Sequence, residues 1–323
     1  MNSTVYSFII PAFNDAPGLA RHLDYFGSIR RDIEIIVVDD CSTDETPSVI
    51  RAADMPENIK IIYHRLPENA GAGAARNAGL ELVSGDLVMF LDADDQLADC
   101  FFDYMDLSPI RNGADFVMFR YHLCATPSER YTYNMHTGDN QFFSSMPMSS
   151  FPAQLFTLGN IPAAARTIAF PWNKVYRRDF LDSIRLRFPE QRMHEDIAPH
   201  WQSFLRARRF GVLNWAPPLI HHYEHQFGCR ATNYVGPERL AVFATLAELA
   251  NEVRIHEDSN CLMAELGRFC EDIFHWMQHM PGIEASADSR HWKQQYMTHA
   301  AQFRATFGLN DPLDAATLAV VLN

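Results

Sequence analysis

The chain has 323 residues, 47% of them hydrophobic and 21% charged, which is an ordinary composition for a packed protein. This length allows one large α/β domain with an appendage, because single hydrophobic cores usually stop growing near ~250 residues. No stretch approaches the ~20 apolar residues that a membrane span needs, and the first residues do not resemble a secretory signal. The formal net charge of −13 argues against a nucleic-acid partner, because phosphate binding depends on clustered Lys and Arg.

Six cysteines lie far apart and form no CxxC pair. This spacing favours reduced thiols and predicts neither a disulfide framework nor a zinc site. The densest basic stretch, residues 206–209, has only three charges and is best explained as a solvated helix end. We therefore expect a cytoplasmic protein. Peripheral association with the inner face of the cell membrane and formation of a homo-oligomer stay open.

The first part of the chain alternates short apolar runs with amphipathic stretches, which is typical of βαβ units and a mainly parallel sheet. The runs are nearly continuous, as expected for strands covered by helices on both faces. Ser42 or Thr43 is a candidate N-cap for a helix that runs to about Ala53. The predicted strands are residues 7–11, 33–38, 59–63 and 87–91.

Farther along the chain, residues 121–151 lack a long period, and we predict strands and loops there. A helix is expected to run from an acidic loop at 193–196 to about residue 208, followed by a strand at 210–213. After Gly236, helical patterns cover residues 237–255 and 261–280.

These patterns predict two parts. Residues 1–235 form an α/β domain, with a ligand-binding half at 1–120 and a second half at 121–235. Residues 236–323 form a helical C-terminal region.

A buried strand leads directly into Asp92-Ala93-Asp94-Asp95. Clustered carboxylates repel one another unless a cation or basic groups neutralise them. Hard oxygen ligands of this kind suit Mg²⁺ or Mn²⁺, which often bridge protein carboxylates and phosphates. The alternative is a solvated turn in which Asp95 caps a helix.

The strand at 33–38 also ends in carboxylates, Asp39 and Asp40. The carboxyl ends of parallel strands converge on one crevice, so the two acidic motifs should lie close together. Asp40 can accept a hydrogen bond from a nucleobase, and Phe13 can stack on the base. Otherwise Phe13 is a core residue and Asp39 a helix cap.

Between the two acidic motifs lies a small-residue block, residues 69–79. A GxGxxG fingerprint that begins at Gly71 would need glycine where Arg76 stands, so a dinucleotide site is rejected. The small residues can instead let a helix start approach a ligand, with Arg76 near phosphate. A surface salt bridge is an equal alternative for Arg76.

These blocks resemble family 2 glycosyltransferases with the GT-A fold. The matching segments are IIPAFND, VVDDCSTDET, NAGAGAARNAGL, GDLVMFLDADD, WNKVYRRDFL and the HED loop, which span roughly residues 7–223. The resemblance implies a Rossmann-like, mainly parallel sheet flanked by helices, to which the C-terminal helical region is appended. It also implies an enzyme that moves a sugar from a nucleotide-sugar, with a UDP-sugar favoured, to a glycan or lipid-linked glycan.

The resemblance also implies roles for individual residues. Asp92, Ala93 and Asp94 would hold Mn²⁺ or Mg²⁺ against the donor diphosphate. Asp40 would recognise the base by accepting a hydrogen bond from it, and Phe13 would stack on the base. Pro11 and Asn14 flank Phe13 and belong to the same donor-binding group, as does Arg76.

Two further residues are implied as the catalytic base, Asp196 and, with less support, Glu195. Taken alone, this acidic pair is better explained as the first-turn cap of a helix. Inversion at the anomeric carbon needs a carboxylate that takes the acceptor proton. His222 is a candidate third metal ligand or diphosphate contact. The cluster around it, residues 221–225, could bind zinc but lacks partner cysteines in the sequence.

Two other functions stay open. A nucleotidyltransferase that makes nucleotide-sugars has a related sheet but normally needs a basic loop after the first strand, and residues 11–18 contain no Lys or Arg. A non-catalytic module that binds nucleotide-sugars would not need an acidic base. Release of pyrophosphate would identify the first, and absence of turnover the second.

Overall fold

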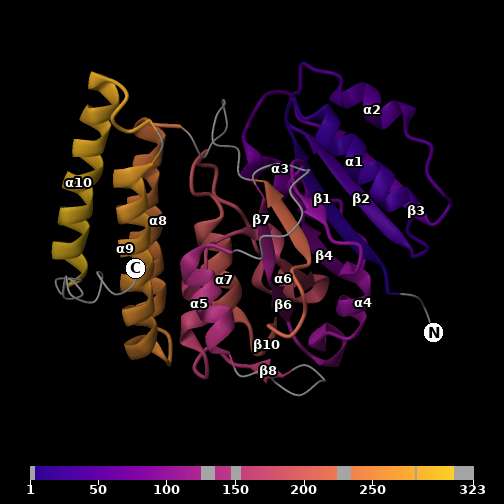
Figure 1. The fold of residues 1–323 in the computed structure, drawn as a ribbon. Coiled ribbons are helices and arrows are strands. Elements are labelled where there is room, and N and C mark those ends of the chain that lie inside the picture. The colour runs from indigo at the N-terminus through magenta and orange to yellow at the C-terminus, as the bar shows by residue number, and fades with distance from the viewer. Residues whose placement is uncertain (1–3, 125–134, 147–153, 224–233, 281, 309–323) are drawn as a thin grey trace. The chain divides into compact units, whose positions relative to one another are not determined.

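The structure is a computed structural model that describes residues 4–124, 135–146, 154–223, 234–280 and 282–308. The chain divides into two compact units, residues 1–225 and 226–323. Both are shown in Figure 1. In the described residues no helix is long and apolar enough to cross a membrane.

The first unit is built on two sheets. Eight strands form the large sheet in the order β3-β2-β1-β4-β9-β6-β10-β8, and three form the small sheet in the order β5-β11-β7. The strands are β1 (Tyr6–Ala12), β2 (Ile33–Asp39), β3 (Ile59–Arg65), β4 (Leu87–Phe90), β5 (Gln96–Leu97), β6 (Phe116–Phe119), β7 (Tyr121–Cys124), β8 (Leu155–Phe156), β9 (Lys174–Arg177), β10 (Phe210–Leu213) and β11 (Ile220–Tyr223).

The four predicted N-terminal strands and the strand at 210–213 are confirmed. β3, β2, β1 and β4 are parallel neighbours, and β6 runs parallel to β10, whereas β9 is antiparallel to both β4 and β6. Every residue of β2 and β4 is buried. Strands buried on both faces need no alternation of polar and apolar residues, which explains their continuous apolar runs. The predicted fold class, a mainly parallel sheet flanked by helices, is therefore confirmed.

Helices connect and flank these strands, and α1 and α2 lie side by side next to β1–β3 (Figure 1). The α-helices of the first unit are α1 (Ala16–Gly27), α2 (Thr46–Ala52), α3 (Ala72–Leu80), α4 (Phe101–Asp106), α5 (Thr137–Ser145), α6 (Arg178–Ile184) and α7 (Ile197–Arg206). Short 3-10 helices lie at Pro109–Asn112, Pro162–Arg166 and Pro171–Asn173.

The predicted start of the helix after β2 is wrong. α2 begins at Thr46, and its N-cap residue Glu45 makes no side-chain capping bond. Ser42 and Thr43 do not cap it, because both bind Asn14 instead: the Ser42 hydroxyl accepts from the Asn14 amide, and the Thr43 amide donates to the Asn14 side chain. These tertiary hydrogen bonds to Asn14 therefore occupy residues that could otherwise have capped a longer helix.

The prediction of strands and loops for residues 121–151 is correct for β7 but wrong for α5. Asp139 of α5 is buried, and its carboxylate accepts hydrogen bonds from the Tyr121 hydroxyl at 2.7 Å and the Ile168 amide at 2.9 Å. Tertiary contacts to a buried carboxylate help to hold this short helix, and they leave no helical period in the sequence. Residues 125–134 and 147–151 of the predicted region lie outside the described residues.

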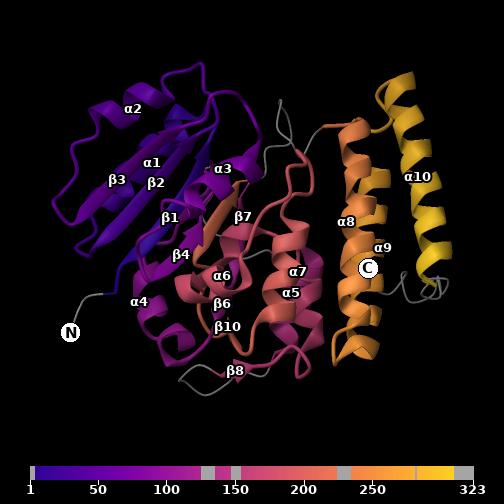
Figure 2. The same cartoon turned by 180° about the vertical axis from the view of Figure 1, so that it is seen from behind.

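The second unit consists of a 3-10 turn (Pro237–Leu240) and the helices α8 (Ala241–Arg254), α9 (Ser259–His279) and α10 (Ala287–Phe307). The helical patterns predicted at 237–255 and 261–280 are confirmed. α8, α9 and α10 lie side by side in both views (Figure 2). The rings of Phe243, Phe274 and Phe303 pack together between them. The apolar residues of α8, such as Leu246 and Leu249, are thus core residues of a helical unit.

Candidate functional site

The ends of β1, β2 and β4 bring the two acidic motifs to one edge of the large sheet. In the parallel ladders Ala12 pairs with Asp39, and Ile9 pairs with Phe90. The residues that follow each strand therefore leave the sheet on the same side, as the sequence predicted. This edge is the candidate functional site.

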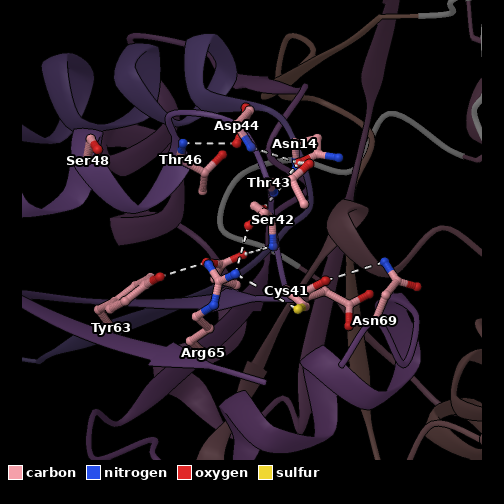
Figure 3. Close-up of polar contacts among 12 residues, drawn as sticks. Asn14, Cys41, Ser42, Thr43, Asp44, Thr46, Ser48, Tyr63, Arg65 and Asn69 are labelled. Carbon is pink, nitrogen blue, oxygen red and sulfur yellow. Dashed lines mark hydrogen bonds and ion pairs between the residues drawn. The ribbon is translucent and has the colours of Figure 1, made fainter. Parts of the chain in front are cut away.

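The loop after β1 organises the loop after β2. Asn14 has a left-handed backbone, with φ of 52°, and its side-chain oxygen accepts from the amides of Thr43 at 2.7 Å and Asp44 at 3.3 Å (Figure 3). Asparagine tolerates this conformation better than most residues. Pro11 is half-buried in β1, whereas Phe13 is 49% exposed. The core alternative for Phe13 is therefore wrong, and its ring is available for stacking.

The two aspartates that end β2 have different surroundings. Asp39 is fully buried and accepts hydrogen bonds from the Ser42 amide, the Tyr63 hydroxyl and the Arg65 guanidinium. It anchors the turn and β3 and does not cap a helix.

Asp40 is 4% exposed, and its two oxygens accept from the amides of Ala70 at 2.7 Å and Gly71 at 2.9 Å. Burial raises the pKa of this carboxyl, while the two amides oppose the rise. Asp40 therefore fastens the small-residue block to the end of β2.

The small residues of α3 allow close approach to other parts of the protein. A Cβ atom at Gly79 would lie 2.4 Å from Cγ2 of Ile9 in β1. A Cβ at Gly73 would lie 3.0 Å from the Pro189 carbonyl and 3.1 Å from Cγ of Glu195. Any larger residue at these places would push α3 away from the sheet or from the HED loop. These two glycines are thus explained by contacts within the protein.

Arg76 of α3 joins the acidic motif after β4 to the HED loop, residues 194–196. It is 4% exposed, and its guanidinium donates to Asp92 Oδ1 at 2.7 Å and to Glu195 Oε1 at 3.0 Å. It also lies over the ring of Phe188. The surface salt-bridge alternative is wrong, because this arginine is buried between two carboxylates. It holds the HED loop against the end of β4.

The carboxylates of Asp92, Asp94 and Asp95 form a compact cluster. Each offers one oxygen within 4.8 Å of the others. One oxygen of Asp95, Oδ2, is buried and has no hydrogen-bond partner among the described residues. A buried carboxylate oxygen without a partner is costly. Together these features fit a divalent cation with oxygen ligands.

The backbone of this cluster is tightly packed. Ala93 is buried, and a Cβ at Gly18 would lie only 2.2 Å from its carbonyl oxygen. His22 of α1 places Nε2 at 3.1 Å from the Asp92 carbonyl, and burial lowers the pKa of His22 to about 4, so the ring is neutral and Nε2–H donates. α1 thus supports the turn that carries the acidic side chains.

His222 of β11 faces the same cluster. Its Nδ1 lies 2.7 Å from Asp95 Oδ1, and its ring stacks on Trp172 with centroids 4.7 Å apart. The helix-cap alternative for Asp95 is wrong, since the residue is 1% exposed and pairs with this histidine. A carboxylate on one ring nitrogen is the usual second partner of a metal-binding histidine, whose other nitrogen binds the metal.

Asp196 stands at the N-terminal end of α7 but makes no side-chain capping bond. Its carboxyl lines a small cavity with apolar side chains, including Phe90, Leu186 and Phe188. Burial raises the pKa of Asp196 to about 7; the Glu195 charge adds to the rise, and Arg76 opposes it. The first-turn cap alternative is therefore wrong for Asp196.

Lys174, in the WNK segment, is fully buried beneath this region. Its ammonium donates to the Phe170 carbonyl at 2.9 Å and to the Asn173 side chain at 2.7 Å. Burial lowers the pKa of Lys174 to about 7, while the charges of Asp139 and Asp196 oppose the fall. The sequence alone indicates no role for His22 or Lys174, although Lys174 belongs to the recognisable WNK block, and it does not show that Asp95 pairs with His222.

The structure thus groups the candidate residues in two sets. In the first set Asp92, Glu195 and Asp196 lie around Arg76. Asp94 lies beside Asp92, and His222 joins this set through Asp95. Pro11, Phe13, Asn14 and Asp40 lie at the ends of β1 and β2 on the same edge. The first set combines a cluster of carboxylates for a cation with one carboxyl of raised pKa. The second offers an exposed aromatic ring and a buried carboxylate.

Known proteins resemble this chain in sequence and in fold. Residues 7–185, more than half of the chain, match the family described as glycosyl transferase family 2. EpsH of Bacillus subtilis (strain 168) is 29% identical over 229 residues, covering 70% of this chain and 62% of EpsH. The poly(ribitol-phosphate) beta-N-acetylglucosaminyltransferase TarS of Staphylococcus aureus (strain MW2) is 26% identical over 216 residues, covering 65% of this chain and 34% of TarS.

This chain therefore spans less than two thirds of the length of either relative. The structure of S. aureus TarS residues 1–349 in complex with UDP-GlcNAc has a TM-score of 0.68 with 20% identity, covering 92% of this chain and 81% of that one. This likeness confirms the GT-A fold. By the match of more than half its length, this chain belongs to glycosyl transferase family 2.

Proposed function

We propose that this protein transfers a sugar from a UDP-sugar to a hydroxyl of a glycan or lipid-linked glycan, with inversion and with the help of Mn²⁺ or Mg²⁺. One observation carries the proposal. Arg76 ties Asp92 to Glu195, so that the carboxyl of raised pKa, Asp196, is held beside the acidic cluster. A transferase needs these two features next to each other, because the leaving diphosphate and the attacking hydroxyl meet at one anomeric carbon.

The donor half of the site supports a uridine nucleotide. Phe13 exposes half of its side chain at the edge where Asp40 ends β2. An exposed aromatic ring offers a stacking surface for a base, and a carboxylate oxygen with a second lone pair can accept from the base imino group. The related TarS was solved with UDP-GlcNAc, which favours a UDP-sugar here as well.

A cation would be held by Asp92 and Asp94, with His222 Nε2 as a third ligand. The fit rests on the short distances among the carboxylates and on Asp95 Oδ2, which has no hydrogen-bond partner within the described ranges. Asp95 itself would orient His222 through Nδ1. When bound, such a cation would offset the charge that builds on the departing diphosphate.

Asp196 would act as the general base. It takes the proton from the acceptor hydroxyl as the oxygen forms a bond to the anomeric carbon. On the opposite face the bond from that carbon to the diphosphate oxygen breaks, and UDP leaves with the electron pair. A base works best when its pKa is close to the working pH, which suits a carboxyl of raised pKa.

We propose that the second unit contacts the acceptor, a partner subunit or a membrane-bound substrate. Association with the inner face of the membrane and formation of a homo-oligomer are part of this proposal. The donor residues all lie within the first unit.

The proposal is tested by incubating the full chain with UDP-, GDP- and CMP-sugars and Mn²⁺, and by measuring release of nucleotide in the presence of polyol and glycan acceptors. We expect UDP release and a product of inverted anomeric configuration. Use of GDP- or CMP-sugars alone, or retention of configuration, would contradict the proposal. Pyrophosphate production from a nucleoside triphosphate and a sugar phosphate would instead show a nucleotidyltransferase.

A further inference from the structure

A second cluster of metal-binding side chains lies on the small sheet, apart from the acidic cluster. β7 and β11 are parallel neighbours, and His221 of β11 lies directly opposite His122 of β7. Cys124 is two residues after His122. Side chains two residues apart on a strand share a face, so all three project to the same side of the two strands.

Two of the three distances among the ligand atoms match the edges of a zinc tetrahedron, and the third is slightly longer. Nδ1 of His122 is 3.3 Å from Nδ1 of His221, and Sγ of Cys124 is 3.5 Å from the first nitrogen and 4.0 Å from the second. Zinc with nitrogen ligands at about 2.0–2.1 Å and a thiolate at about 2.3 Å sets two nitrogens about 3.3 Å apart and a nitrogen and the sulfur about 3.6 Å apart. We propose that His122, Cys124 and His221 bind a zinc ion.

The ligand types select the metal. Thiolate and imidazole favour zinc over Mg²⁺ and Mn²⁺, which prefer oxygen. His122 and Cys124 are buried, and a neutral imidazole and a thiolate are the forms that bind the metal. On binding, the Cys124 thiol releases its proton to solvent and becomes a thiolate. Among the described residues, these three side chains are the protein ligands of the site.

Linear sequence hides this site because Cys124 and His221 are 97 residues apart. The sequence therefore showed a histidine cluster at 221–225 without a cysteine. The pairing of β7 with β11 supplies the missing thiol. Only the three-dimensional register, His221 opposite His122, makes the ligand set visible.

The site has a consequence for the neighbouring acidic cluster, which rests on the proposed function. His221 and His222 are consecutive on β11 and point to opposite faces. The ion would hold β11 to β7 on one face, while His222 contacts Asp95 on the other. Zinc at this place would therefore position a histidine of the donor site without touching the donor.

The test uses the full chain without an affinity tag. The protein is stripped with chelator, titrated with Zn²⁺ and analysed for bound metal by mass spectrometry. We expect stoichiometric zinc in the wild type and in Cys100→Ala, a matched cysteine control. Removal of a hydrogen-bond partner of a metal ligand lowers metal affinity roughly 10–100-fold. Cys124→Ala removes a ligand itself, so its affinity for zinc should fall by more than this factor. Equal zinc content in Cys124→Ala and Cys100→Ala would overturn the proposal.

Two further measurements separate this site from the donor site and guard against a variant that does not fold. Asp94→Ala should keep its zinc even if it loses binding of UDP with Mn²⁺, so the two proposals can fail independently. Replacement of zinc by Co²⁺ in the wild type should produce the near-ultraviolet charge-transfer band of a cobalt–thiolate bond. Absence of this band would show that the three side chains are merely hydrogen-bonded to one another.

Discussion

Replacing Asp196 by asparagine should both lower the rate of sugar transfer and raise the free energy of unfolding. Asparagine keeps the shape of the side chain but cannot take the acceptor proton. A positioned general base contributes about 10²–10⁴-fold, so transfer should fall by that factor. Affinity for UDP and the cation should stay nearly unchanged, because Asp196 acts on the acceptor. Glu195→Gln should reduce transfer less.

The stability change follows from the raised pKa. Burial moves the pKa of Asp196 from 3.8 to about 7. At about 1.36 kcal/mol for each pKa unit, ionising this carboxyl in the folded protein costs at most about 4 kcal/mol more than in the unfolded chain. Between pH 4 and 7 the folded state keeps a proton that the unfolded state has lost, so this group lowers stability as pH rises.

Asparagine at position 196 has no proton to lose. The free energy of unfolding that the variant gains over the wild type should therefore be near zero at about pH 4 and largest above about pH 7. Urea unfolding of both proteins at several pH values, without donor or metal, measures this difference. In parallel, the wild-type transfer rate should fall tenfold for each pH unit below about 7, since the base must be ionised. Near-normal transfer by Asp196→Asn, or a stability difference that does not depend on pH, would refute the reasoning.

Three other predictions concern the rest of the site. Asp94→Ala should abolish the Mn²⁺ dependence of UDP binding in calorimetry, and unchanged wild-type binding in excess chelator would contradict the metal assignment. Arg76→Met leaves two carboxylates unpaired and should cost about 3–5 kcal/mol in urea unfolding, whereas Arg187→Met, at an exposed ion pair with Glu81, should change stability by less than about 1 kcal/mol. A fragment of residues 1–225 should still bind UDP. If this fragment failed to fold, the helical unit would have to be part of the same hydrophobic core.

The strands and the acidic motifs could be predicted because their signals are local. Short apolar runs such as residues 35–38 and 87–91, with polar residues directly after them, are typical of buried parallel strands that end at one edge of a sheet. The positions of Phe13, Asp40 and Asp92 follow from this topology. The helices of the second unit were likewise visible from their periodicity.

The contacts that make a site from these residues are not local. Arg76 binds Asp92, 16 residues away, and Glu195, 119 residues away, and its burial distinguishes this ion pair from a surface one. A helix cap was an open alternative for Asp95, and it was the better explanation of Asp196 when the acidic pair was taken alone. Both cases were decided by His222, 127 residues from Asp95, and by the apolar cavity at Asp196.

The start of α2 and the helix α5 show the same limit within secondary structure, since Asn14 takes the capping groups and buried Asp139 holds a helix without a periodic pattern. The pKa of a charged group, the strength of an ion pair and the assembly of a set of metal ligands all depend on burial and on distances between side chains. Burial and distance exist only once the chain has folded, which is why the local sequence determined the framework and the tertiary structure decided the chemistry.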